Sequence, residues 1–202
     1  GIGNSGMDVL EGLLRLRQIC DHPALIGNND GGGSVKIDEL VRGLQENAGS
    51  HKVLVFSQFT QMLQLIREEF EKAGITYSYL DGKTSLNQRK EQVSRFQEDP
   101  NIKTFLISLK AGGVGLNLTV ADYVYLVDPW WNPAAEQQAI DRAHRIGQTR
   151  KVFAYKMICK DTVEERILKL QERKQLLADE LIQEDSGVVK NLTREDIEFL
   201  FG

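Results

Sequence analysis

Apolar and polar positions follow a repeating order along most of the chain. Short apolar runs typical of buried strands occur at residues 52–56, 76–80, 104–108, 123–127 and 152–158. Between these runs, apolar residues recur at helical spacing in segments that begin at Thr60, Ser85 and Pro133. Because parallel strands are joined by crossover connections that are usually helical, this order predicts an α/β fold, a parallel β-sheet flanked by helices on both faces.

Start signals mark these helices. Thr60 is expected to cap the first of them, and Ser85 with Gln88 has the spacing of a capping box. Asn132 is the expected N-cap of the third, followed by a proline, which fits the first helical position. The helical period of this third segment continues to about Arg145, so we expect a helix over residues 133–145.

Further helical patterns flank this core. A helix is expected over residues 7–20, and a second one follows the Gly-rich connector 28–34. Near the other end, Thr162 opens a long amphipathic helix and Thr193 a terminal one, and we expect their apolar stripes to dock against the sheet domain. The chain is thereby divided into an N-terminal helix with its connector, an α/β domain and a C-terminal helical extension, at residues 1–35, 36–160 and 161–202.

Composition excludes several classes of protein. With 202 residues, of which 41% are hydrophobic and 27% charged, the chain suits one globular α/β domain with a substantial core. No apolar run approaches the roughly 18 residues that would cross a bilayer, so no membrane partner is expected. Cys20 and Cys159 lie far apart in sequence and lack metal-ligand spacing, so we expect buried thiols in a reducing compartment, with no disulfide and no metal site.

The net charge of −4 argues at first against a nucleic-acid partner. However, residues 102–160 contain 8 basic and 4 acidic side chains, a local net charge of +4. Charges more than about 8 Å apart are largely screened at physiological salt, so this segment can present a positive surface on an acidic chain.

A glycine-rich loop follows the predicted strand 104–108. It runs from Lys110 through Gly112 and Gly113 to Gly115. Glycines let the backbone approach a ligand closely, and their N–H groups can point at an anion such as a phosphate. A tight structural turn explains the same glycines, and the sequence leaves both readings open.

Gln138, Arg142 and Arg145 lie at i, i+4 and i+7 of the predicted helix 133–145, so we expect them on one face. A guanidinium carries a permanent charge and a planar fork of donors that matches phosphate oxygens. This is the chemistry that stabilises charge in phosphoryl transfer, although arginines on a polar helix face are often simply solvated. Trp130 and Trp131, in the turn before this helix, are either buried anchors or stacking platforms for nucleic acid.

The sequence contains no nucleotide-binding motif of its own. Gly82, Lys83 and Thr84 imitate the end of a phosphate-binding loop, but Tyr77 stands where that loop requires a glycine. No Asp-Glu box that would hold magnesium follows an apolar strand. The predicted arginines therefore need a nucleotide that is held elsewhere.

Six signatures in order resemble the C-terminal RecA-like lobe of the Swi/Snf family, superfamily-two ATPases that translocate on DNA. They are Leu-Arg-Gln-Ile-Cys-Asp-His-Pro (16–23), Val-Leu-Val-Phe-Ser-Gln-Phe (53–59), Tyr-Leu-Asp-Gly (79–82), Ser-Leu-Lys-Ala-Gly-Gly-Val-Gly-Leu-Asn-Leu (108–118), Asp-Pro-Trp-Trp-Asn-Pro (128–133) and Asp-Arg-Ala-His-Arg-Ile-Gly-Gln (141–148). The resemblance covers nearly the whole chain and implies a RecA-like fold whose C-terminal helices act as a brace.

The resemblance also implies roles for individual residues. Arg142 and Arg145 match paired arginine fingers that reach the γ-phosphate of ATP, which the other lobe holds together with Mg²⁺. The other implied positions are Gln138 and Gly115 at the same cleft, Lys110 and Trp131 on the DNA backbone, and Ser57, Gln58 and Gly82 facing the same DNA strand.

The function that follows is the C-terminal motor lobe of an ATP-dependent double-stranded DNA translocase that remodels chromatin or other nucleoprotein. Its expected partners are double-stranded DNA, an N-terminal ATPase lobe in cis and a DNA-bound protein target, and the isolated chain is expected to be inactive. A non-catalytic DNA-binding or regulatory module with the same fold is the alternative, and an RNA-helicase lobe is disfavoured by the last signature. The expected location is the cytoplasm, on a bacterial nucleoid, or the nucleus if the source is eukaryotic.

Overall fold

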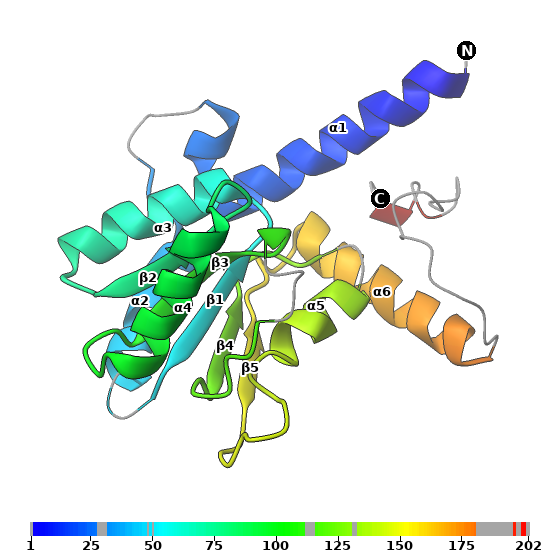
Figure 1. Ribbon diagram of the computed structural model, residues 1–202. Coiled ribbons are helices and arrows are strands. Elements are labelled where there is room, and N and C mark those ends of the chain that lie inside the picture. Colours follow the sequence, from blue (N-terminus) through cyan, green and yellow to red (C-terminus); the bar gives the residue numbers. More distant parts are fainter. Residues whose placement is uncertain are drawn as a thin grey trace.

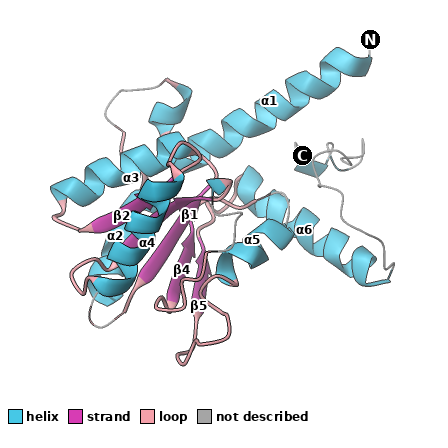
Figure 2. Cartoon of the chain, viewed as in Figure 1, coloured by secondary structure: helices cyan, strands magenta, loops and turns pink. Residues whose placement is uncertain are grey.

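The computed structural model describes residues 2–27, 32–47, 49, 51–111, 116–130, 133–180, 196, 199 and 200, with backbone only for residues 2–8, 10, 47 and 174–180. Five parallel strands form one sheet in the order β2-β3-β1-β4-β5 (Figures 1 and 2). They are β1 (Val53–Ser57), β2 (Tyr77–Leu80), β3 (Thr104–Ser108), β4 (Tyr123–Leu126) and β5 (Phe153–Lys156). The predicted α/β fold with a parallel sheet is confirmed.

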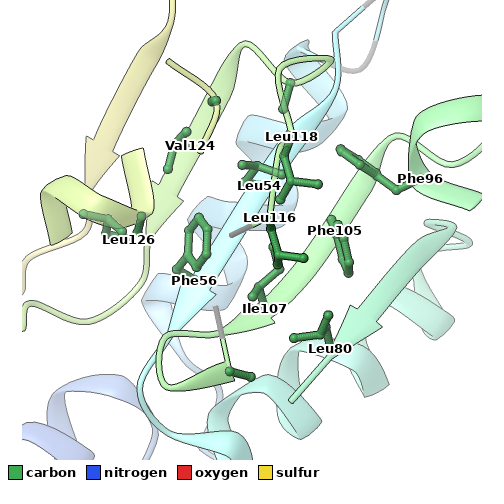
Figure 3. Packing of buried hydrophobic residues seen from close by; sticks show 14 of the residues in the cluster. Leu54, Phe56, Leu80, Phe96, Phe105, Ile107, Leu116, Leu118, Val124 and Leu126 are labelled. Carbon is green, nitrogen blue, oxygen red and sulfur yellow. The ribbon is translucent and has the colours of Figure 1, made fainter. Parts of the chain in front are cut away.

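Helices cover both faces of the sheet. Side chains along each strand point alternately to one face and to the other, so each face carries apolar side chains that a helix can bury. On β1, Val53 and Val55 pack with apolar residues of α2 (Val35–Asn47) and α3 (Thr60–Lys72). Leu54 and Phe56 point the other way, into a cluster that includes Phe96 of α4 (Leu86–Glu98) and Ala139 of α5 (Pro133–Ile140) (Figure 3). The unbroken apolar run of β1 thus reflects burial on both faces.

Two further helices lie beside this domain, α1 (Ile2–Asp21) and α6 (Val163–Glu180), and a short 3-10 helix, η1 (Pro23–Ile26), follows α1. Ile167 and Leu170 of α6 pack with Leu13 of α1 and with Leu200 in a separate apolar cluster. For this part of the α6 stripe, the expectation of docking against the sheet is therefore wrong, because α1 covers it. The side chains of Leu176, Leu177 and Leu181 lie outside the described residues. Most of the predicted terminal helix after Thr193 lies outside the described residues.

Several predicted boundaries are corrected. The helix predicted over 133–145 ends at Ile140, where turns take over, and its expected cap Asn132 lies outside the described residues. Phe59, not Thr60, is the N-cap of α3. The capping box of Ser85 and Gln88 is present.

No helix in the described part of the chain is long and apolar enough to cross a membrane.

Candidate functional site

The strand order places several predicted site residues along one edge of the sheet. In parallel sheets, ligands bind outside the carboxyl ends of the strands, where the strand order reverses. The central strand β1 lies between β3 and β4, so the chain crosses over it after β3. Gly82, Lys110, Gln58 and Asp128 follow β2, β3, β1 and β4 respectively. With neighbouring strands about 4.8 Å apart, these four positions span roughly 14 Å of a continuous edge.

Asp128 organises the middle of this edge. Its carboxylate accepts a hydrogen bond from the Ser57 hydroxyl and another, 3.0 Å long, from the Gln58 backbone N–H. Burial raises the pKa of Asp128. Ser57 is fully buried, so its hydroxyl serves the turn and does not face outward. The Gln58 side chain keeps a buried amide nitrogen that has no hydrogen-bond partner among the described residues.

Gly82 and Lys110 are exposed at the other two strand ends. The Gly82 turn is held by Asp81, whose Oδ1 accepts a 2.9 Å hydrogen bond from the Lys83 backbone N–H. Apart from residue 82 and its two chain neighbours, no atom of the described residues lies within 4 Å of the place where a Cβ of residue 82 would sit, so the backbone there is open to close approach. Trp131 and Gly115 lie outside the described residues.

Three arginines, Arg89, Arg142 and Arg145, form what we call the arginine group. Arg142 is only 5% exposed, and its Nε and Nη1 have no hydrogen-bond partner in the described ranges. Burial lowers the pKa of Arg142, and the like charges of Arg145 and Arg89 lower it further. A buried cation whose charged neighbours are cations lacks the anion that would stabilise it. The arrangement therefore suits a bound phosphate.

The turn after α5 fixes the backbone of Arg142. The Arg142 carbonyl accepts a 3.0 Å hydrogen bond from Leu118 N–H, just beyond the glycine-rich loop. The Gln148 side-chain nitrogen lies 2.8 Å from Ala121 O and 3.0 Å from Ala143 O. Gly147 adopts φ +106°, which a residue with a side chain rarely adopts. These tertiary bonds end the helix earlier than its period predicts.

Arg142 and Arg145, the two predicted arginine fingers, therefore lie in a turn and not in a helix. The expectation that Gln138, Arg142 and Arg145 share one helix face is wrong. Gln138 is exposed on α5, and Arg145 is exposed in the turn. The structure nevertheless keeps both arginines close enough for their charges to interact.

Arg89 is the member of the group that sequence reasoning missed. It lies in the first turn of α4, and from the sequence alone a charged residue at such a position is expected to be solvent-exposed. Its Nη1 donates a 2.9 Å hydrogen bond to Ala111 O, at the start of the glycine-rich loop, while its buried Nε has no partner in the part of the chain that is described. Arg89 therefore connects the glycine-rich loop to the arginine group.

A second set of buried charges contains both signs. The Lys36 ammonium lies 2.7 Å from Asp21 Oδ1 and 2.6 Å from Glu164 Oε1, and it also donates to Val127 O at 2.8 Å. Arg17 of α1 donates to Pro129 O and lies within the electrostatic reach of Asp128 and Asp21. We call these residues, namely Arg17, Asp21, Lys36, Asp128 and Glu164, the ion cluster. It joins α1, α2 and α6 to the carboxyl end of β4.

Comparison with known proteins places this geometry in a family. Residues 35–147 match the helicase conserved C-terminal domain. DNA repair protein rad8 of Schizosaccharomyces pombe is 44% identical over 83% of this chain and 15% of that protein. The putative ATP-dependent helicase/translocase YwqA of Bacillus subtilis is 42% identical over 96% of the chain and 22% of that protein. The chain thus spans less than a quarter of the length of these relatives.

Solved structures agree. The Sulfolobus solfataricus SWI2/SNF2 ATPase C-terminal domain has a TM-score of 0.76 and 33% identity, covering 99% of this chain and 83% of that one. The core of the same ATPase in complex with double-stranded DNA gives a TM-score of 0.76 and 36% identity over 99% of this chain and 42% of that one. The RecA-like fold expected from the sequence is confirmed, and the chain belongs to the helicase conserved C-terminal domain family as a C-terminal lobe of the SWI2/SNF2 type.

Proposed function

We propose that this chain is the C-terminal motor lobe of an ATP-dependent double-stranded DNA translocase. In this proposal an N-terminal lobe of the same protein holds ATP with Mg²⁺, and Arg142 and Arg145 reach across the cleft to the γ-phosphate. The supporting observation is the arginine group, which buries Arg142 among cations and leaves two of its nitrogens without partners in the described residues.

The arginine group fits the charge that develops in phosphoryl transfer. Negative charge spreads over the equatorial oxygens of the transferred group, and a fixed guanidinium stabilises it without further reorganisation. Mg²⁺, which the N-terminal lobe would hold, would neutralise part of this charge when bound. Arg142 would donate from Nε and Nη1 to phosphate oxygens, with Arg145 as the exposed second finger. Gln138 and Gly115 belong to the same cleft in this proposal.

The carboxyl edge of the sheet is the proposed track for DNA. Lys110 and Trp131 would contact the DNA backbone, and Gln58 and Gly82 would face the same strand. The exposed turn at Gly82, with open space where a Cβ would sit, supports these contacts. Ser57 takes part through its hydrogen bond to Asp128, which holds the turn that carries Gln58. Closure of the cleft on ATP would shift this edge along the duplex, past a DNA-bound protein target.

The test is the ATPase rate, with and without duplex DNA, of the protein that carries this lobe together with its nucleotide-binding lobe. Arg142→Ala and Arg145→Ala should lower kcat by about 10³-fold or more, while DNA affinity stays within a few-fold of wild type. Arg42→Ala is the matched control, since Arg42 pairs with Glu39 and Glu46 on the exposed side of α2.

DNA coupling is tested on the same protein. Lys110→Ala should weaken the stimulation of ATPase by duplex DNA, whereas Lys72→Ala, an exposed lysine paired with Glu69 on α3, should not. Wild-type turnover in both arginine variants would refute the catalytic role. DNA binding without any ATPase in the wild-type protein would favour a non-catalytic DNA-binding module, and stimulation by RNA instead of duplex DNA would favour an RNA helicase.

A further inference from the structure

The only two cysteines of the chain, 139 residues apart in sequence, meet where α1 ends and the chain enters α6. Their Sγ atoms lie within 4.8 Å of each other, and the Cys159 thiol also donates a 3.2 Å hydrogen bond to Cys20 O. Both side chains are partly exposed, which corrects the expectation of fully buried, separate thiols. We propose that Cys20 and Cys159 form a reversible disulfide when the protein meets a peroxide, a cross-link that ties α1 to the entry of α6.

Cys159 is held in place for this reaction. Its backbone N–H donates a 2.9 Å hydrogen bond to Glu164 Oε2, and its carbonyl accepts a 2.6 Å bond from the Thr162 hydroxyl. An S–S bond is about 2.05 Å long, so the two sulfurs need to approach by no more than about 2.8 Å.

Cys20 is the thiol that reacts first. The neighbouring Cys159 thiol stabilises the Cys20 thiolate and lowers the pKa of Cys20 to about 7, against the opposing effect of partial burial. The same pairing raises the pKa of Cys159. Thiolates, not thiols, attack peroxides. Cys20 also lines an open hollow of about 310 Å³ together with Thr162 and Leu200, which gives a small oxidant access to its sulfur.

The reaction balances with a peroxide as the two-electron oxidant. The Cys20 thiolate attacks one peroxide oxygen, the O–O bond breaks, and Cys20 becomes a sulfenic acid as hydroxide leaves. The Cys159 sulfur then attacks the Cys20 sulfur, the S–O bond breaks, and the departing hydroxide takes up the Cys159 proton to leave as water. A dithiol reductant reverses the cross-link by thiol–disulfide exchange.

A metal ion fits this cluster less well than a disulfide does. Glu164 lies close enough to both sulfurs to complete a set of three ligands. However, its Oε1 is paired with Lys36 and its Oε2 accepts from Cys159 N–H. The Lys36 ammonium would also repel a cation bound at this point.

Peptide mapping tests the proposal directly. The protein that contains this chain is reduced, desalted and exposed to hydrogen peroxide, its remaining thiols are alkylated, and it is then unfolded and digested with trypsin. Cleavage after Arg17 and Lys36 places Cys20 in peptide 18–36, and cleavage after Lys156 and Lys160 places Cys159 in peptide 157–160. Both alkylated peptides should be lost in favour of a linked pair two hydrogen masses lighter than the sum of the two free-thiol peptides, and dithiothreitol followed by alkylation should restore the alkylated peptides.

Two variants separate the steps. Cys159→Ser should leave a sulfenic acid on Cys20 that dimedone traps, with no linked peptide, and Cys20→Ser should leave Cys159 available for alkylation. Should either variant fail to fold, the wild-type peptide map still decides. Unlinked peptides at peroxide concentrations that oxidise Cys20 to a sulfinic acid would overturn the proposal. Protection of both thiols by Zn²⁺, with no linked pair after peroxide, would overturn it as well.

Discussion

The arginine group and the ion cluster both bury charge in this lobe, but they balance it differently. In the ion cluster, Lys36 is sandwiched between Asp21 and Glu164 and its remaining donor reaches a backbone carbonyl. In the arginine group, Arg142 is equally buried, but the charges that act on it are those of Arg145 and Arg89. Lys36 thus has two carboxylate partners within the chain, whereas no carboxylate among the described residues acts on Arg142.

A buried charge that has a partner inside the fold can serve stability, whereas a buried charge without such a partner points to a ligand. Removing water from an ion costs several kcal/mol, and a partner inside the fold must recover that cost if the ion serves stability. In the ion cluster, Asp21 and Glu164 are such partners for Lys36, and the cluster connects three helices to the sheet. In the arginine group, no anion among the described residues offsets the desolvation of Arg142. This is expected if a bound anion interacts with Arg142 during catalysis.

Removing the charge of Arg142 tests whether this residue serves catalysis and not stability, and it should have the largest effect. If the proposed function holds, Arg142→Met in the protein that carries both lobes should lower kcat by about 10³-fold or more, because the transition state would lose a guanidinium. Its free energy of unfolding should stay within about 1 kcal/mol of wild type or rise, because a buried charge without an anion is replaced by an apolar side chain. Steady-state ATPase and urea denaturation measure the two quantities. A large loss of stability would mean that Arg142 is a structural residue.

The same substitution in the ion cluster should have the opposite profile. Lys36→Met leaves Asp21 and Glu164 buried without their cation, so we expect a loss of about 3–5 kcal/mol in the free energy of unfolding. Urea denaturation measures it, and Lys72→Met on the surface of α3 is the control, expected to change stability by less than about 1 kcal/mol. Wild-type stability in Lys36→Met would contradict a structural ion cluster.

Arg89 tests whether the arginine group extends beyond the two fingers. Arg89→Ala removes the hydrogen bond to Ala111 O and one of the charges beside Arg142, so kcat should fall by roughly 10–100-fold, the equivalent of one charged hydrogen bond. Arg89→Lys keeps the charge and should recover part of the loss. A KM change with unaltered kcat would assign Arg89 to nucleotide binding alone.

A further test of the ion cluster concerns pH. Three carboxylates face two cations in the ion cluster, and burial, aided by Asp128, raises the pKa of Asp21 to about 8. The folded state therefore retains a proton that the unfolded chain releases near pH 4, so stability should decrease as pH rises from about 4 to about 8, by at most about 1.4 kcal/mol per pH unit. Asp21→Asn should flatten this slope in urea titrations, and an unchanged slope would place the proton elsewhere.

Local pattern explains what could be predicted from the sequence. The apolar run of β1 and the capping box of Ser85 and Gln88 depend on neighbours in sequence, and both were predicted correctly. The spacing and the signature of residues 141–148 drew attention to Arg142 and Arg145, but they did not reveal that Arg142 is buried beside other cations. The end of α5 at Ile140 was missed because it depends on hydrogen bonds from Leu118 and Gln148, which no helical period reveals.

Long-range contacts explain the rest. Lys36 meets Glu164 across 128 positions of sequence, and Cys20 meets Cys159 across 139. Each of these residues alone has an ordinary local context, so only the fold brings out its role. Arg89 is the clearest case, since an arginine in the first turn of a helix carries no local sign of its contact with the glycine-rich loop.

The most direct test of the central claim compares the affinities of wild type and Arg142→Ala for two ligands, ADP and ADP with aluminium fluoride, a mimic of the transferred phosphoryl group. If an outside anion completes the arginine group, the variant should bind the mimic at least about 100-fold more weakly while its affinity for ADP stays within about twofold. Equal affinities of both proteins for the mimic would contradict the account, as would an equal loss for both ligands.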